Sequence, residues 1–65
     1  EYMSQEAAKE KFLKVYANLP LGIREEIILV LEGKPITWNA AYLEVNNDTK
    51  NSQEILRKLE ELKIL

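Results

Sequence analysis

The residues of this sequence best suited to acid–base chemistry are four carboxylates: Glu25, Glu26, Asp48 and Glu54. The sequence contains no histidine and no cysteine. It therefore lacks the side chain best suited to proton transfer near neutral pH and also the usual zinc ligands. No nucleophile, metal-ligand cluster or phosphate-binding loop accompanies the acids. We therefore expect no enzymatic activity, no catalytic residues, no metal site and no cofactor.

Composition places the chain among small folded domains. Its 65 residues are enough for one domain, and 46% of them are hydrophobic. A chain of this size buries only about 60% of its unfolded surface, and the absence of cysteine excludes disulfides. We expect residues 1–65 to form a single domain, with residues 1–3 disordered or derived from a tag.

Charge and hydropathy limit the partners. The formal net charge of −2 is unlike the basic balance of most strong nucleic-acid binders. No apolar run approaches the ~20 residues that cross a membrane, and the N-terminus lacks the pattern of a signal peptide. We expect a cytoplasmic protein with no membrane partner.

The spacing of apolar residues predicts an all-α fold, a compact four-helix domain. The first helix spans about residues 5–17, with Ser4 as its N-cap. The third begins after Thr37, a second capping residue, and the fourth begins at Asn51, where Glu54 completes a capping-box pattern. The side chains expected to be mostly buried are Phe12, Ile27, Val30, Leu31, Trp38, Ile55 and Leu59.

The segment that must be central spans about residues 22–32. Its run Ile27–Leu31 is apolar and rich in β-branched residues, so a buried strand is the alternative to a helix. Polar residues 24–26 fit the first turn of a helix, while Gly33 and then Pro35 fit its end. No neighbouring stretch alternates cleanly enough to be a partner strand, and we therefore predict a helix.

The order of elements from Ile36 onward is a capped short helix, a polar turn and a helix that ends in residues 56–65, Leu-Arg-Lys-Leu-Glu-Glu-Leu-Lys-Ile-Leu. This order resembles the core of winged-helix and helix-turn-helix DNA-binding domains. The resemblance implies a transcriptional regulator whose last helix reads DNA. The connection from Val45 to Asn51 is longer than a compact helix-turn-helix permits, and the sequence has no β-wing after Lys63, where the family usually has glycine.

Carried over by position, the resemblance implies that six residues face double-stranded DNA: Lys50, Asn51, Ser52, Gln53, Arg57 and Lys58. Arginine and lysine reach guanine edges or phosphates, and asparagine and glutamine pair with adenine. The alternative is an ordinary capped surface helix in a non-catalytic protein-interaction or assembly module without a nucleic-acid role. For a domain this small we also expect a homo-oligomer, formed through Leu62, Ile64 and Leu65.

Overall fold

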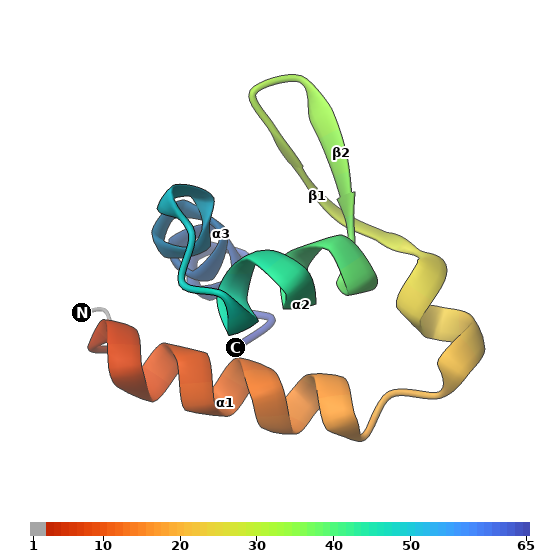
Figure 1. Cartoon of the computed structure of the whole chain (residues 1–65), viewed down its shortest axis with the longest axis horizontal. Coiled ribbons are helices and arrows are strands. Elements are labelled where there is room, and N and C mark those ends of the chain that lie inside the picture. The colour runs from red at the N-terminus through yellow and green to blue at the C-terminus, as the bar shows by residue number, and fades with distance from the viewer. Residues whose placement is uncertain (1–2) are drawn as a thin grey trace.

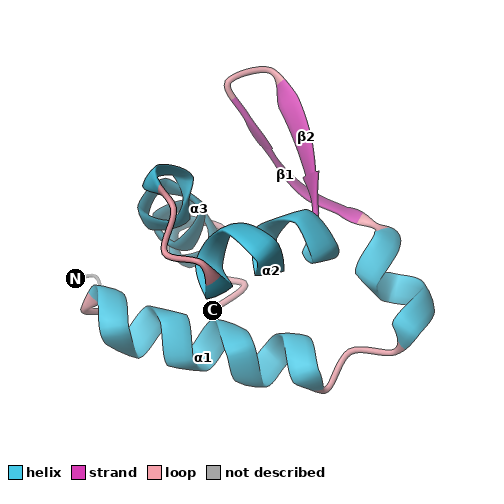
Figure 2. Cartoon of the chain, in the orientation of Figure 1, coloured by secondary structure: helices cyan, strands magenta, loops and turns pink. Residues whose placement is uncertain are grey.

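The computed structural model describes residues 3–65, and Glu1 and Tyr2 lie outside the described part. In chain order the elements are α1 (Gln5–Ala17), the 3₁₀ helix η1 (Leu21–Glu25), β1 (Ile27–Leu31), β2 (Lys34–Thr37), α2 (Trp38–Asn46) and α3 (Lys50–Glu61) (Figures 1 and 2). The strands form one antiparallel hairpin. Over residues 3–65 the fold is therefore mixed α+β, with three α-helices and a two-stranded sheet. The prediction of an all-α, four-helix domain is wrong.

The error lies in the segment 22–32, which forms η1 and β1 instead of a helix. Glu32 and Gly33 have φ of 51° and 80°, and they form a two-residue turn that pairs Leu31 with Lys34. Positive φ at both central residues is the requirement of a type I′ hairpin turn. Glycine after an apolar run thus fits a hairpin as well as a helix end. The partner strand was missed because it contains Pro35, which is tolerated on an edge strand.

Burial along β1 has the period of a strand and not that of a helix. Leu29 and Leu31 are each 6% exposed, whereas Val30 between them is 56% exposed. Ile27 is 60% exposed, because an irregularity in the ladder between Ile27 and Leu29 changes the alternation at that point. The predicted burial of Ile27 and Val30 is therefore wrong, and that of Leu31 is confirmed.

The core lies where α1, α2 and α3 meet the inner face of the hairpin. Its largest fully buried side chains are Phe12, Val45, Ile55 and Leu59. Trp38 is also buried, and its ring lies 5.8 Å from that of Phe12. The predicted burial of Phe12, Trp38, Ile55 and Leu59 is confirmed. Among residues 3–65, no helix has the length and apolar character needed to cross a membrane.

Local capping positions the helices. The Ser4 hydroxyl accepts a hydrogen bond from the Ala7 N–H at 3.2 Å, and the Thr37 hydroxyl accepts one from the Ala40 N–H at 3.0 Å. Both predicted N-caps are confirmed. The predicted cap of the last helix is wrong: α3 begins at Lys50 with Thr49 as N-cap, so Asn51 lies inside the helix.

Polar and aromatic contacts connect η1 to the helices. The Arg24 guanidinium lies 4.3 Å from the centre of the Tyr16 ring and donates a hydrogen bond to the Tyr16 carbonyl at 3.0 Å. The Tyr16 hydroxyl donates to the Asn39 side-chain oxygen at 2.6 Å, and the Asn39 amide donates to Glu25 at 2.8 Å. These contacts hold η1, which directly precedes the hairpin, against α1 and α2.

Candidate nucleic-acid interface

The connection between α2 and α3 is short. Because α2 continues to Asn46 and α3 already begins at Lys50, only residues 47–49 join them. The expectation of a longer connection from Val45 to Asn51 is therefore wrong. Helix-turn-helix motifs have turns of three to four residues. Figure 1 shows that the two helices run in different directions, since α2 lies across the view while α3 is seen nearly end-on.

The turn is fixed by local hydrogen bonds and by one long-range ion pair. Asn47 caps α2, its side-chain amide donating to the Leu43 carbonyl at 2.8 Å. Asp48 adopts a φ of 51°, a left-handed conformation that aspartate tolerates better than most residues. Its carboxylate accepts hydrogen bonds from the Lys9 ammonium at 2.9 and 3.1 Å, which ties the turn to α1. Both side chains retain solvent exposure, so this pair contributes at most about 1 kcal/mol.

An apolar seam determines which side of α3 faces outward. Ile55, Leu56 and Leu59 are buried, and Ser52 on the same side is only 6% exposed. The Ser52 hydroxyl donates to the Thr49 carbonyl at 2.7 Å. Ser52 therefore does not lie on the exposed face, in contrast to the position implied by the resemblance.

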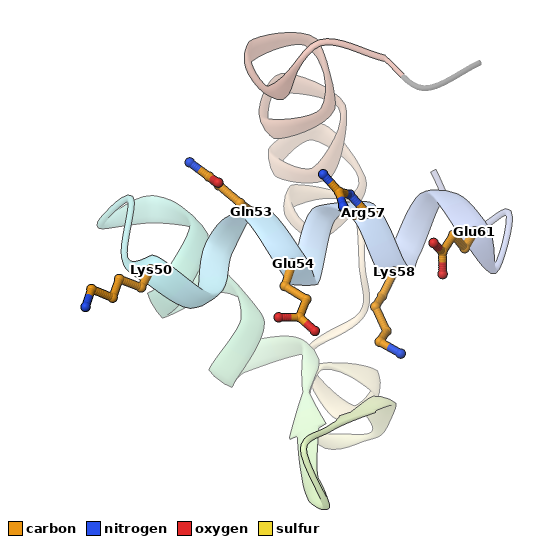
Figure 3. Close-up of a pocket in the computed structure, with 6 residues that line it drawn as sticks. All are labelled: Lys50, Gln53, Glu54, Arg57, Lys58 and Glu61. Atoms are coloured by element: carbon orange, nitrogen blue, oxygen red, sulfur yellow. The ribbon is translucent and has the colours of Figure 1, made fainter.

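The other five residues expected to face DNA remain accessible. Lys50, Asn51, Gln53 and Arg57 are exposed, and Lys58 is half-buried. A shallow depression runs along this face and is lined by Lys50, Gln53, Glu54, Arg57, Lys58 and Glu61 (Figure 3). Because all six belong to α3, the depression is a helix surface and not an enclosed pocket for a small molecule.

The side chains in Figure 3 leave the helix in two directions. Gln53 and Arg57 point to the side on which α1 lies, whereas Glu54 and Lys58 point to the side of the hairpin. Acids and cations are interspersed along α3: Glu54 lies between Lys50 and Arg57, and Glu61 follows Lys58. The three basic and two acidic residues of the depression leave this face with a net charge of +1. It can offer cations to a polyanion at separate points, but it does not form a continuous basic patch.

The set implied by the resemblance omitted two residues of the depression, Glu54 and Glu61. Their position on this face could have been predicted from the sequence, because residues four apart share a helix face. Glu54 follows Lys50 by four positions, and Glu61 follows Arg57 by four. Among the lysines of α1, none lines this depression.

The C-terminal residues expected to form an oligomer are largely used within the chain. Ile64 and Leu65 are half-buried and pack against the core, and their N–H groups donate to the Leu59 carbonyl at 2.9 and 3.4 Å. Leu62 remains 55% exposed. Only one of the three side chains is thus mainly available to a partner.

Comparison of the chain with protein-family models, with curated proteins and with solved structures gives no match.

Proposed function

We propose that this chain is a DNA-binding module of the helix-turn-helix type, a transcriptional regulator that acts in the cytoplasm and presents α3 to double-stranded DNA. The observation that supports this best is the three-residue turn between α2 and α3. The helix after that turn is the one whose exposed face carries Lys50, Arg57 and Lys58. Such a motif places its second helix in the major groove.

The dimensions and chemistry of α3 suit that groove. Its twelve residues give a length of about 18 Å, and the B-DNA major groove is about 12 Å wide. Arg57 and Lys58 supply contacts to phosphates or guanine edges, while Asn51 and Gln53 have the donor and acceptor pair that matches adenine. Glu54 and Glu61 oppose phosphate approach, so few phosphates are contacted.

Counterion release makes this proposal measurable. Each neutralised phosphate lowers log affinity by about 0.9 per unit of log salt. Three cations on α3 therefore give a slope of at most about −2.7 in a titration with mixed-sequence duplex followed by fluorescence anisotropy. Replacing Arg57 and Lys58 together by glutamine should weaken binding and reduce the slope by up to about 1.8, because two contacts are lost.

The matched control removes the same charge elsewhere. Lys11 and Lys14 are exposed on α1 and do not line the α3 depression. Replacing both by glutamine should leave the salt slope near that of the parent protein. Equal losses in the two double variants would indicate nonspecific charge attraction, and no binding at tens of micromolar protein in low salt would refute the proposal.

One observation favours the alternative, a protein-interaction module. The hairpin exposes two large apolar side chains, Ile27 at 60% and Val30 at 56%. Under this alternative the duplex is not bound at any salt concentration, and association responds to apolar substitutions instead of to Arg57 and Lys58.

A further inference from the structure

Strand β1 has one edge that no other segment of residues 3–65 pairs with, because the sheet consists of β1 and β2 alone. Leu31 and Lys34 close the two-residue turn, and the next pair is Val30 with Pro35. Hydrogen-bonded and non-hydrogen-bonded pairs alternate along an antiparallel ladder. The pair that closes a two-residue turn is hydrogen-bonded, so the N–H and C=O of Val30 point away from β2.

The outer edge of β2 is different, because it carries Pro35 at the corresponding position. Proline has no N–H, so it cannot donate to a further strand. A proline on an edge strand is a common protection against edge-to-edge pairing. Pairing with a further strand is therefore disfavoured on the β2 side, whereas the β1 side has no such proline.

The side chains of β1 add to this difference. The strand reads Ile-Ile-Leu-Val-Leu and contains no charge, proline or glycine. Val30 and Ile27 are more than half exposed, and Pro35 beside Val30 is exposed as well. An uncharged, β-branched edge strand with exposed apolar side chains is what native proteins usually cover.

We propose that a second copy of this chain covers this edge, with the two β1 strands antiparallel about a two-fold axis at Val30. The pairing forms a four-stranded sheet across the dimer. On one face of this sheet the side chains then lie in the order Pro35, Val30, the partner's Val30 and the partner's Pro35. The pairing adds hydrogen bonds along the outer edge of β1, while Leu29 and Leu31 stay packed in the core. The inference does not rest on the proposed DNA binding, since it uses the hairpin and not α3.

The second copy is favoured over other occupants because the β1 edge is complementary to itself: the free N–H and C=O of Val30 can meet the same groups of a copy, and the strand has no charge that would repel it. An edge that pairs with its own copy gives a closed, self-complementary contact. The two free edges of the resulting sheet are the two β2 strands, each with its proline. Assembly therefore stops at the dimer and does not continue into a fibre.

The first test is site-directed cross-linking, which is unambiguous because the sequence has no cysteine. In the proposed register the two copies of Val30 form a hydrogen-bonded pair, with Cα atoms about 5.5 Å apart, within disulfide range. Val30→Cys should form a disulfide-linked dimer under mild oxidation. Leu43→Cys is the control, because Leu43 is 60% exposed but lies on α2. Equal cross-linking of the two variants would overturn the proposal.

The second test is sedimentation equilibrium of the full chain from about 10 μM to about 1 mM, a range that covers weak dimers. The parent protein should fit a monomer–dimer equilibrium. Val30→Lys should raise the dissociation constant by roughly tenfold or more, because it places like charges directly opposite each other. Leu43→Lys should leave that constant unchanged.

Monomer at all concentrations would overturn the proposal, and it is the result expected if the edge takes an extended peptide from another protein. Growth beyond the dimer would overturn the role given to Pro35.

Discussion

Replacing Leu59 by alanine tests the position of the core most directly. Leu59 is fully buried on α3, within the same cluster as Phe12, Val45 and Ile55. Truncation to alanine therefore loses the transfer free energy of the removed carbon atoms and leaves a cavity in the core. Fully burying a leucine contributes about 1.5–3 kcal/mol, and the cavity raises the total cost to about 2–5 kcal/mol.

That cost is large relative to the stability of so small a domain. A core of this size supplies about 3–5 kcal/mol of net stability. A loss of about 3 kcal/mol should lower the melting temperature by roughly 12–24 °C, at about 4–8 °C per kcal/mol. If about 1 kcal/mol remains, roughly one molecule in seven is unfolded at 25 °C. The loss should be visible in urea denaturation as a lower midpoint with an unchanged slope.

The control is the same substitution on the surface. Leu43 is also helical, but it is 60% exposed, so Leu43→Ala should change the free energy of unfolding by no more than about 0.5 kcal/mol. Both variants are measured by thermal and urea denaturation followed by far-UV circular dichroism. Equal effects of the two substitutions, or an unchanged melting curve for Leu59→Ala, would refute the assignment of Leu59 to the core.

Two further substitutions test local structure. Thr37→Ala removes the side chain that caps α2 and should cost about 0.5–2 kcal/mol, while Thr37→Ser, which keeps the hydroxyl, should restore most of it in a thermal melt. Glu32→Asn converts the hairpin turn into Asn-Gly, the sequence that a type I′ turn prefers, and should raise the melting temperature by a few degrees, up to about 8 °C, because Glu32 has φ of 51°. A lower melting temperature for Glu32→Asn would contradict the turn that joins β1 to β2.

The helix caps at Ser4 and Thr37 and the bounds of the first helix were predicted correctly from local signals. Ser4 and Thr37 cap helices because their hydroxyls reach an N–H three residues away, at Ala7 and Ala40. The stripe of apolar residues along α1 repeats every three to four positions and predicts the bounds of that helix without knowledge of what it packs against. Such signals depend only on residues close together in the sequence, and the folded protein retains the caps and the helix that they predict.

The hairpin could not be predicted in the same way, because its decisive contacts lie between two segments. The run Ile27–Leu31 satisfies a helix and a strand equally well, and Gly33 ends either one. The strand is stabilised by its pairing with Lys34–Thr37, a segment with too little alternation to be recognised alone. Leu29 and Leu31 are then buried against the helices. This packing favours the strand over a helix, and it cannot be read from the residues of this segment alone.

The rotation of α3 illustrates what helical geometry alone determines. Ser52 precedes Ile55, Leu56 and Leu59 by three, four and seven residues, so it falls on the apolar seam and is buried with them. That spacing alone is enough to remove Ser52 from the candidate site. The start of α3 at Lys50 depends instead on the neighbouring turn. The hydroxyl of the N-cap residue Thr49 donates hydrogen bonds to Glu44 and makes none to the N–H groups of α3.

The same geometry constrains the proposed ligand of α3. Any face that contains Lys50 and Arg57 also contains Glu54 and Glu61, since residues four apart lie above one another. A ligand of uniform negative charge is therefore repelled at two of the five charged positions. A DNA major groove differs from such a ligand, because it places base edges between its two phosphate backbones. There a glutamate accepts a hydrogen bond from the cytosine amino group, while Arg57 and Lys58 bind phosphates or guanine.

The proposed function thus requires Glu54 to face bases and not the backbone. Glu54→Gln should then change which duplex sequences are preferred more than it changes the salt dependence of binding, and a uniform gain of affinity for all sequences would contradict this arrangement.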